Sequence, residues 1–187
     1  MVFNLFNTIT IGDEMILSGW DVASYKTGVF FLDLETLKFK STLIDIKSND
    51  LYARLRVFKE KTAKLLSTYE PDLLIVESTY LDEWRKHKNT KKRGNVNTLK
   101  ILEKFHGVLL SNTKDYMDIH YMAPSEHKEA LTGVGNASKQ STIWSVQKKL
   151  GIVGIDDNQA DAAALVLAYL VRKQQWDILD RIKRMYE

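Results

Sequence analysis

The 187-residue sequence predicts an α/β fold: a mixed five-stranded sheet, with three antiparallel strands followed by two parallel strands, flanked by helices. Two observations predict this class. Three β-favouring apolar runs are followed by a helix, a strand, a helix and a strand, and the last third of the chain has helical patterning throughout. The length and the lack of an internal repeat or low-complexity linker predict a single domain over residues 1–187.

The first three predicted strands cover residues 15–20, 28–34 and 37–46. Gly28 starts the second strand, and the third is rich in Leu, Phe, Thr and Ile, which favour strands. The link between the first two strands is short enough for a hairpin, so we expect them to be antiparallel neighbours. Residues 1–14 have only a weak pattern, and we predict no element there.

A helix is predicted next, because apolar residues recur at helical spacing from about Asn49 to Tyr69. Ser48 or Asn49 is a candidate cap for its start, and Pro71 ends it. The continuously apolar residues 72–77 then predict a short strand that is buried on both faces.

The rest of the chain is predicted to be mostly helical. A basic, Gly-containing loop covers residues 81–95, a helix covers 96–111, and the fifth strand covers 117–122. Pro at the first turn and Gly at the end then mark further helices. These cover residues 124–133, 138–150, 158–173 and 175–186.

Three acidic residues lie at the ends of apolar elements, where folding can bring them together. Asp21 follows the first strand, Glu77 closes the fourth, and Asp161 lies near the start of an apolar helix. Mg²⁺ prefers carboxylate oxygens, and two such ions about 4 Å apart can orient an attacking water and stabilise the leaving oxygen of a phosphodiester. Asp157 and Asn158 lie on the same helix face as Asp161, and helix capping is the competing explanation for both.

Composition excludes several other classes of site. The chain has no cysteine, and hence no disulfide framework, thiolate metal site or thiol nucleophile. No apolar stretch reaches the roughly 18 to 20 residues that span a bilayer, and no secretory signal is evident, so we expect a cytoplasmic protein with no membrane partner. The histidines lack metal-ligand spacing and are interpreted as incidental; they are His87, His106, His120 and His127.

Four segments, in this order, make the chain resemble the RuvC family of Holliday junction resolvases. Asp21–Gly28 resembles the family's first-strand motif, and Glu77–Tyr80 resembles its second acidic motif. Lys128–Lys139 is similar to the family's Lys-x₄-Gly-x-Gly-x₃-Lys run, and Ala160–Ala162 to its closing Ala-Asp-Ala. Each motif alone is weak, but the ordered set is specific and spans most of residues 15–170.

This resemblance implies an RNase H-like fold and a homodimer that cuts four-way junctions and other branched DNA with Mg²⁺, or Mn²⁺ as a substitute. Carried over by position, Asp21, Glu77 and Asp161 would hold the metal ions. Lys128 and Lys139 would lie beside the scissile phosphate, where fixed positive charge stabilises developing negative charge. The alternative for both lysines is an ordinary solvated position on a helix.

The resemblance also implies DNA contacts. Tyr80 would stack on a base near the junction centre, although a core tyrosine is a competing interpretation. The helix at 96–111 would be the dimer face. The loop at 85–93 carries six positive charges and no acid, which predicts salt-sensitive binding to phosphates. These cationic residues are Arg85, Lys86, Lys88, Lys91, Lys92 and Arg93.

One position departs from the family pattern, because Asn158 stands where an Asp is common three residues before the last Asp. Either Asn158 ligates through its carbonyl, or Asp157 or Asp156 replaces the missing carboxylate. A junction-binding protein that has lost hydrolysis therefore stays open as an alternative function. A sugar-kinase or actin-like ATPase is disfavoured, because the chain lacks a second domain with glycine-rich loops. The small size and lysine-rich composition are compatible with a phage-encoded relative.

Overall fold

The computed structural model describes residues 11–12, 14–79, 96–151 and 155–186. The predicted basic loop at 81–95 lies outside these ranges. Within them, strands and helices follow the predicted order. The elements are β1 (Ile16–Asp21), β2 (Lys26–Asp33), β3 (Phe39–Asp45), α1 (Leu51–Tyr69), β4 (Leu73–Glu77), α3 (Val96–Ser111), β5 (Asp118–Met122), α4 (Pro124–Thr132), α5 (Lys139–Leu150), α6 (Asp157–Arg172) and α7 (Trp176–Tyr186).

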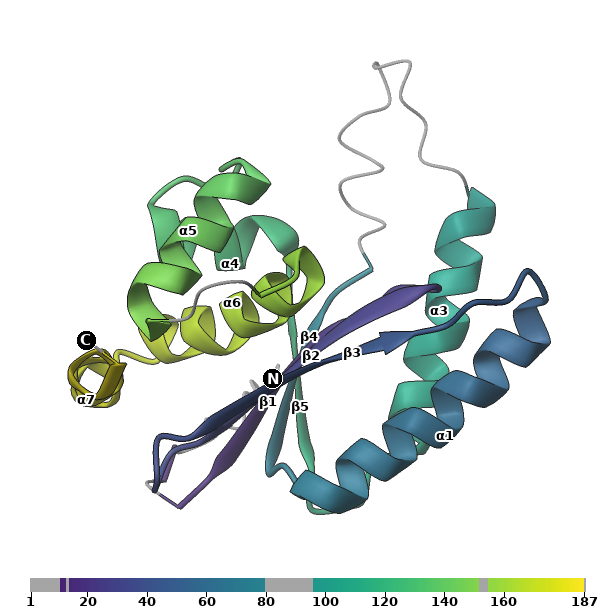
Figure 1. The fold of residues 1–187 in the computed structure, drawn as a ribbon, viewed down its shortest axis with the longest axis horizontal. Coiled ribbons are helices and arrows are strands. Elements are labelled where there is room, and N and C mark those ends of the chain that lie inside the picture. Colours follow the sequence, from purple (N-terminus) through teal and green to yellow (C-terminus); the bar gives the residue numbers. More distant parts are fainter. Residues whose placement is uncertain (1–10, 13, 80–95, 152–154, 187) are drawn as a thin grey trace, which may run out of the picture.

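The strands form one sheet in the order β3-β2-β1-β4-β5. The β1–β2 and β2–β3 pairs are antiparallel, whereas β4 is parallel to both β1 and β5. The predicted mixed five-stranded sheet and the predicted hairpin are therefore confirmed. Helices α1 and α3 cover one face of the sheet, and α6 covers the other, with α4 and α5 packed on α6 (Figure 1).

Two hydrophobic cores lie on opposite faces of the sheet, because side chains alternate along each strand. On β2, Phe30 and Leu32 face the core beneath α6. Val29 and Phe31 face the core beneath α1 and α3. Because both faces of the central strands are covered, their ends are the places where polar groups can remain accessible.

The start of α1 differs from the sequence prediction, whereas its end agrees with it. The N-cap of α1 is Asp50, whose side chain accepts a hydrogen bond from the backbone N–H of Ala53, so the prediction of Ser48 or Asn49 was wrong. The helix ends at Tyr69 because Glu70 adopts a left-handed conformation just before Pro71.

None of the helices in the described ranges combines the length and apolar character that a bilayer span requires.

Candidate active site

Asp21 and Glu77 are brought together by the sheet itself. They are the last residues of β1 and β4, which run parallel and side by side, with Trp20 paired to Val76. The two carboxyl groups therefore emerge at the same edge of the sheet and share a hydrogen bond. The structure thus places two of the three predicted acids side by side.

Helix α6 brings the third acid to the same edge, and glycines in the strands allow it to do so. A Cβ atom on Gly28 would lie 1.8 Å from the backbone oxygen of Asn158, and one on Gly19 would lie 2.0 Å from that of Ala162. Only residues without a side chain permit this close approach. The first turns of α6, which carry Asp161, consequently rest directly on β1 and β2.

The turn that follows Asp21 is held by a buried hydroxyl. The Oγ1 atom of Thr27 accepts a hydrogen bond from the backbone N–H of Ala23 at 3.0 Å and donates one to the carbonyl of the same residue at 2.9 Å. Thr27 itself is fully buried, and the two bonds are partly buried. They close the β1–β2 turn and fix the direction in which Asp21 leaves its strand.

Burial and crowding of negative charge raise the proton affinity of the strand-end pair. Burial, followed by the charge of Asp161, raises the pKa of Asp21 to about 6. Burial, followed by the charge of Asp21 and the hydrogen bond with it, raises the pKa of Glu77 to about 8. The pair therefore retains a shared proton at neutral pH, as expected for adjacent carboxyl groups that cannot both ionise freely.

Two lysines supply positive charge to this cluster. The Nζ atom of Lys139, at the start of α5, lies 3.1 Å from Asp161 Oδ2. Burial disfavours the charged form of Lys139, but its hydrogen bond with Asp161 and the neighbouring carboxylates outweigh that effect and raise its pKa. Lys128, on α4, lowers the pKa of Glu77 through its charge. Both predicted lysines thus lie within electrostatic reach of the carboxylates.

The residues that precede Asp161 have different environments. Asp156 caps α6 and forms an ion pair with Lys26, so the capping role considered for Asp157 and Asn158 belongs to Asp156. The backbone N–H and Nδ2 of Asn158 each donate to Asp156 Oδ1 at 2.9 Å. Asn158 Nδ2 is thereby fixed, and its Oδ1 is the atom available to a ligand. Asp157 is 63% exposed and lies 3.9 Å from Lys139 Nζ.

His127 is a neighbour of the site that the sequence analysis treated as incidental. Its Nδ1 atom lies 3.8 Å from Glu77 Oε1, and the side chain is only 1% exposed. Burial, followed by the charge of Lys128, lowers its pKa to about 4, so the ring is neutral at pH 7 and forms no ion pair with Glu77. Within the described residues, neither ring nitrogen has a hydrogen-bond partner. The sequence signal that could have indicated His127 is its position directly before Lys128, which was itself a predicted site residue.

The predicted DNA-contacting residues lie outside the described ranges, so the structure does not place them. They are Tyr80, Arg85, Lys86, Lys88, Lys91, Lys92 and Arg93.

The donor set fits a hard divalent cation. It consists of carboxylate oxygens and one amide oxygen, and a bound cation would offset the burial and the neighbouring negative charge that raise the pKa of Asp21 and of Glu77. Across the described ranges, no three His, Asp or Glu side chains already converge tightly enough to enclose an ion. The ammonium group of Lys139, in contact with Asp161, supplies the nearby positive charge instead.

Asp21 and Glu77 thus leave adjacent strands at one edge of the sheet, and Asp161 approaches them on α6. The sequence profile of "Crossover junction endodeoxyribonuclease RuvC" matches residues 19–169, which is most of the chain. The chain therefore belongs to the RuvC family.

Curated relatives and solved structures agree with this assignment. RuvC of Brachyspira hyodysenteriae is 28% identical over 164 residues, covering 86% of this chain and 96% of that protein. RuvC of Rickettsia prowazekii is 26% identical over 160 residues, covering 83% and 95%. The fold matches Thermus thermophilus RuvC with a TM-score of 0.67 at 17% identity, covering 87% of this chain and 97% of that one. It also matches the Thermus protein in complex with a Holliday junction, with a TM-score of 0.66 at 17% identity, covering 86% and 96%.

Proposed function

We propose that this chain is a divalent-metal-dependent endodeoxyribonuclease that cuts four-way junctions and other branched DNA. The observation that carries the proposal is the pairing of Asp21 with Glu77, within electrostatic reach of Asp161, in the region that matches the RuvC family. These groups are positioned by two adjacent strands and one helix, so the site is built on rigid elements.

The same three carboxylates are the proposed metal ligands, with Mg²⁺ as the ion and Mn²⁺ as a substitute. Bound there, the cations would activate a water molecule and stabilise the leaving oxygen of the phosphodiester. Asn158 is the proposed fourth ligand, through Oδ1, because its Nδ2 is already held by Asp156. Asp156 is engaged with Lys26, and Asp157 points its charge toward Lys139, so each is a weaker candidate.

Lys139 and Lys128 are proposed to stabilise the negative charge that develops on the phosphate. Lys139 is already drawn to the carboxylate cluster, and it is 48% exposed, so its ammonium group can turn from Asp161 toward an incoming phosphate. His127 is proposed as a positioning residue: as a neutral imidazole it can donate to Glu77 after a shift of less than 1 Å from its 3.8 Å separation.

DNA binding is proposed to extend beyond the carboxylates through Tyr80 and the basic loop at 85–93, as the sequence predicts. Six positive charges in this loop would give an affinity that falls steeply with salt. The loop follows Glu77 directly in the chain, which supports contact with a substrate held at this site.

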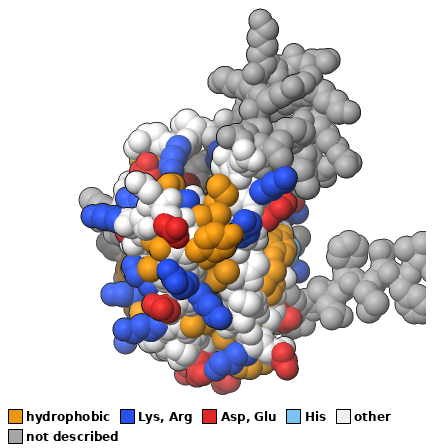
Figure 2. All heavy atoms as spheres, turned by 90° about the vertical axis from the view of Figure 1, so that its right-hand side faces the viewer, with side chains coloured by type: hydrophobic (Ala, Val, Ile, Leu, Met, Phe, Trp, Pro, Cys, Tyr) orange, Lys and Arg blue, Asp and Glu red, His pale blue; other side chains and the backbone are white. Residues whose placement is uncertain are grey.

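A homodimer is proposed because resolving a junction requires cuts in two opposing strands. Helix α3 is the candidate interface, in agreement with the sequence prediction. Hydrophobic side chains gather on the face of the molecule formed by α1 and α3, as Figure 2 shows. The exposed hydrophobic residues of these helices are Tyr52 of α1, at 72% exposure, and Leu110 of α3, at 36%. A cytoplasmic location is also proposed, since the curated relatives are bacterial proteins; a phage origin is a further proposal based on size and composition.

The experiment that tests the proposed function compares Asp21→Asn with wild type on a synthetic four-way junction in Mg²⁺. We expect cleavage to fall by at least about 100-fold, because the variant loses a ligand charge, whereas junction binding changes by less than about threefold. Asp45→Asn, at the exposed end of β3, is the matched control and should cut normally. Full cleavage by Asp21→Asn would exclude the metal-site assignment.

The second candidate function is junction binding without hydrolysis, which the neutral Asn158 favours because it removes one negative charge from the usual ligand set. The same assay separates the two functions. Wild-type protein that shifts the junction in a gel but leaves no nicks in Mg²⁺ or Mn²⁺ would support this second function. Plain duplex and flap substrates, run in parallel, define the substrate preference.

A further inference from the structure

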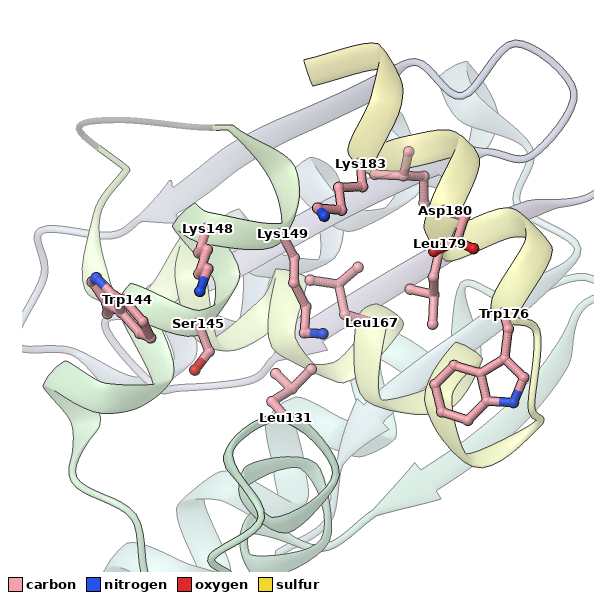
Figure 3. A pocket seen from close by; sticks show the side chains of 11 residues that line it. Leu131, Trp144, Ser145, Lys148, Lys149, Leu167, Trp176, Leu179, Asp180 and Lys183 are labelled. Atoms are coloured by element: carbon pink, nitrogen blue, oxygen red, sulfur yellow. The ribbon is translucent and has the colours of Figure 1, made fainter. Parts of the chain in front are cut away.

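A groove lies on the outer side of the helical layer, formed by α4, α5, α6 and α7 (Figure 3). Its volume is about 410 Å³, which is large enough for two or three buried side chains. Leu131, Leu167 and Leu179 give it an aliphatic lining. Trp144 and Trp176 stand at opposite ends, and they are 59% and 55% exposed. Large exposed aromatic groups beside an apolar groove are typical of interaction surfaces.

The rim of this groove is predominantly basic. Lys148 and Lys149 project from α5 and Lys183 from α7, against a single acid, Asp180. Among the described residues, Lys148 and Lys149 form no ion pair; Lys148 instead lies over the Trp144 ring, with its Nζ atom 5.0 Å from the ring centroid. The charges of Lys148 and Lys149 are therefore available to an external anionic group.

We propose that this groove binds a partner protein through a short acidic segment that carries large apolar side chains. The aliphatic lining would accept the apolar side chains, the two tryptophans would cover them, and the lysines would pair with the flanking carboxylates. Such grooves with charged rims are a recurrent mode of peptide recognition, in which the apolar anchors give affinity and the charges give orientation.

Nucleic acid fits the groove less well, although it too is anionic. Bases stack on open aromatic faces, whereas one face of Trp144 is covered by Lys148 and the floor between the tryptophans is aliphatic. The part of the groove lined by Lys149 also lies away from the carboxylates. Helix α5 begins at Lys139, beside Asp161, and Lys149 lies ten residues further on, or about 15 Å along the helix axis.

The test is selection of a display library of random short peptides on the full-length protein, followed by affinity measurements by fluorescence anisotropy. We expect enriched peptides to combine Asp or Glu with Phe, Leu, Ile or Trp. Their affinity should fall at least about tenfold in Lys148→Glu/Lys149→Glu and about fivefold in Trp176→Ala. The matched control is Lys40→Glu/Lys47→Glu near the two ends of β3, where both side chains are exposed and the change in charge is the same.

Three outcomes would overturn the proposal: enriched peptides without acidic residues, equal peptide binding by the groove and control variants, or a junction-DNA affinity that falls only in the groove variant with a shallower salt dependence. The last result would assign the groove to nucleic acid. Lys148→Gln/Lys149→Gln removes the two positive charges without adding negative ones, and circular dichroism shows whether each variant is folded. Weaker peptide binding by a folded variant is then a loss of the binding surface and not of the fold. Junction cleavage by wild type is measured alongside, because the proposed nuclease function stands or falls independently of the groove.

Discussion

Binding of a divalent cation to the metal-free protein should release protons, and the number released follows from the strand-end pair. The pKa of Asp21 is raised to about 6, chiefly by burial and then by the charge of Asp161. The pKa of Glu77 is raised to about 8, chiefly by burial and then by the charge of Asp21. A metal ligand must be deprotonated, so any proton on these carboxyls has to leave when the cation binds.

The number of protons released, and the change of cation affinity with pH, follow from these pKa values. At pH 7, a group with a pKa of about 8 is roughly nine-tenths protonated, and one with a pKa of about 6 is roughly one-tenth protonated. The pair therefore holds about one proton at pH 7 and about one-tenth of a proton at pH 9. Because fewer protons must be displaced as the pH rises, the apparent affinity for the cation should increase about tenfold between pH 7 and pH 9.

Isothermal titration calorimetry measures this release directly. Titrating Mg²⁺ or Mn²⁺ into EDTA-stripped protein, in buffers that differ in ionisation enthalpy, gives the number of protons that the buffer takes up at each pH. We expect about one proton at pH 7 and almost none at pH 9. Glu77→Gln removes the group that holds most of the proton, so its release at pH 7 should approach zero.

Two results would refute the reasoning. Absence of proton release by wild type at pH 7 would mean that the carboxyls are already ionised, and hence that burial and repulsion are weaker than the geometry implies. An equal release at pH 7 and pH 9 would mean that the proton comes from another group.

Three further predictions concern stability and ligand identity. Because the pKa of Glu77 in the folded state lies above its usual value, the folded protein binds a proton that the unfolded chain has lost. Without metal, the free energy of unfolding of wild type in urea should therefore fall by on the order of 3 to 5 kcal/mol from pH 5 to pH 9. That of Glu77→Gln should fall much less. Gly28→Ala should lower the free energy of unfolding by at least about 2 kcal/mol, since the new methyl group would overlap the backbone of Asn158; a loss below about 0.5 kcal/mol would contradict the packing of α6 on β2. Asn158→Asp should bind Mg²⁺ about tenfold more tightly at pH 9 in calorimetry, and unchanged affinity would exclude Asn158 as a ligand.

Much of the fold was predictable because periodicity is a local property of the sequence. The continuously apolar β4 and the β-favouring runs of β2 and β3 gave strand predictions that matched within two residues. Helix starts were harder, because Ser48, Asn49 and Asp50 are all competent caps and lie next to one another. The choice depends on which side chain reaches the N–H of Ala53, a geometric detail that composition does not contain.

The acidic residues of the site were predictable from their positions at element ends, but their surroundings were not. Lys26 and Asp156 are 130 residues apart in sequence, so nothing local predicts their ion pair. His127 was missed for a related reason. Metal-ligand spacing compares residues that are close together in the sequence, whereas Glu77, the neighbour of His127 in the structure, belongs to the distant strand β4. Such pairs exist only after β4 and α4 have been placed against each other.

The departure at Asn158 becomes understandable when the whole first turn of α6 is considered. Asp156 accepts from the backbone and side chain of Asn158 and is itself neutralised by Lys26, so this carboxylate is an anchor for the helix start rather than a spare ligand. An Asp at position 158 would place a second carboxylate against Asp156, and it would add negative charge to a cluster in which Glu77 already retains its proton. A neutral amide avoids both repulsions and still presents an oxygen. With the proposed ligand set, Asn158 would lower the affinity for the cation and stabilise the metal-free site. The tighter binding expected for Asn158→Asp should therefore come with a lower unfolding free energy in EDTA.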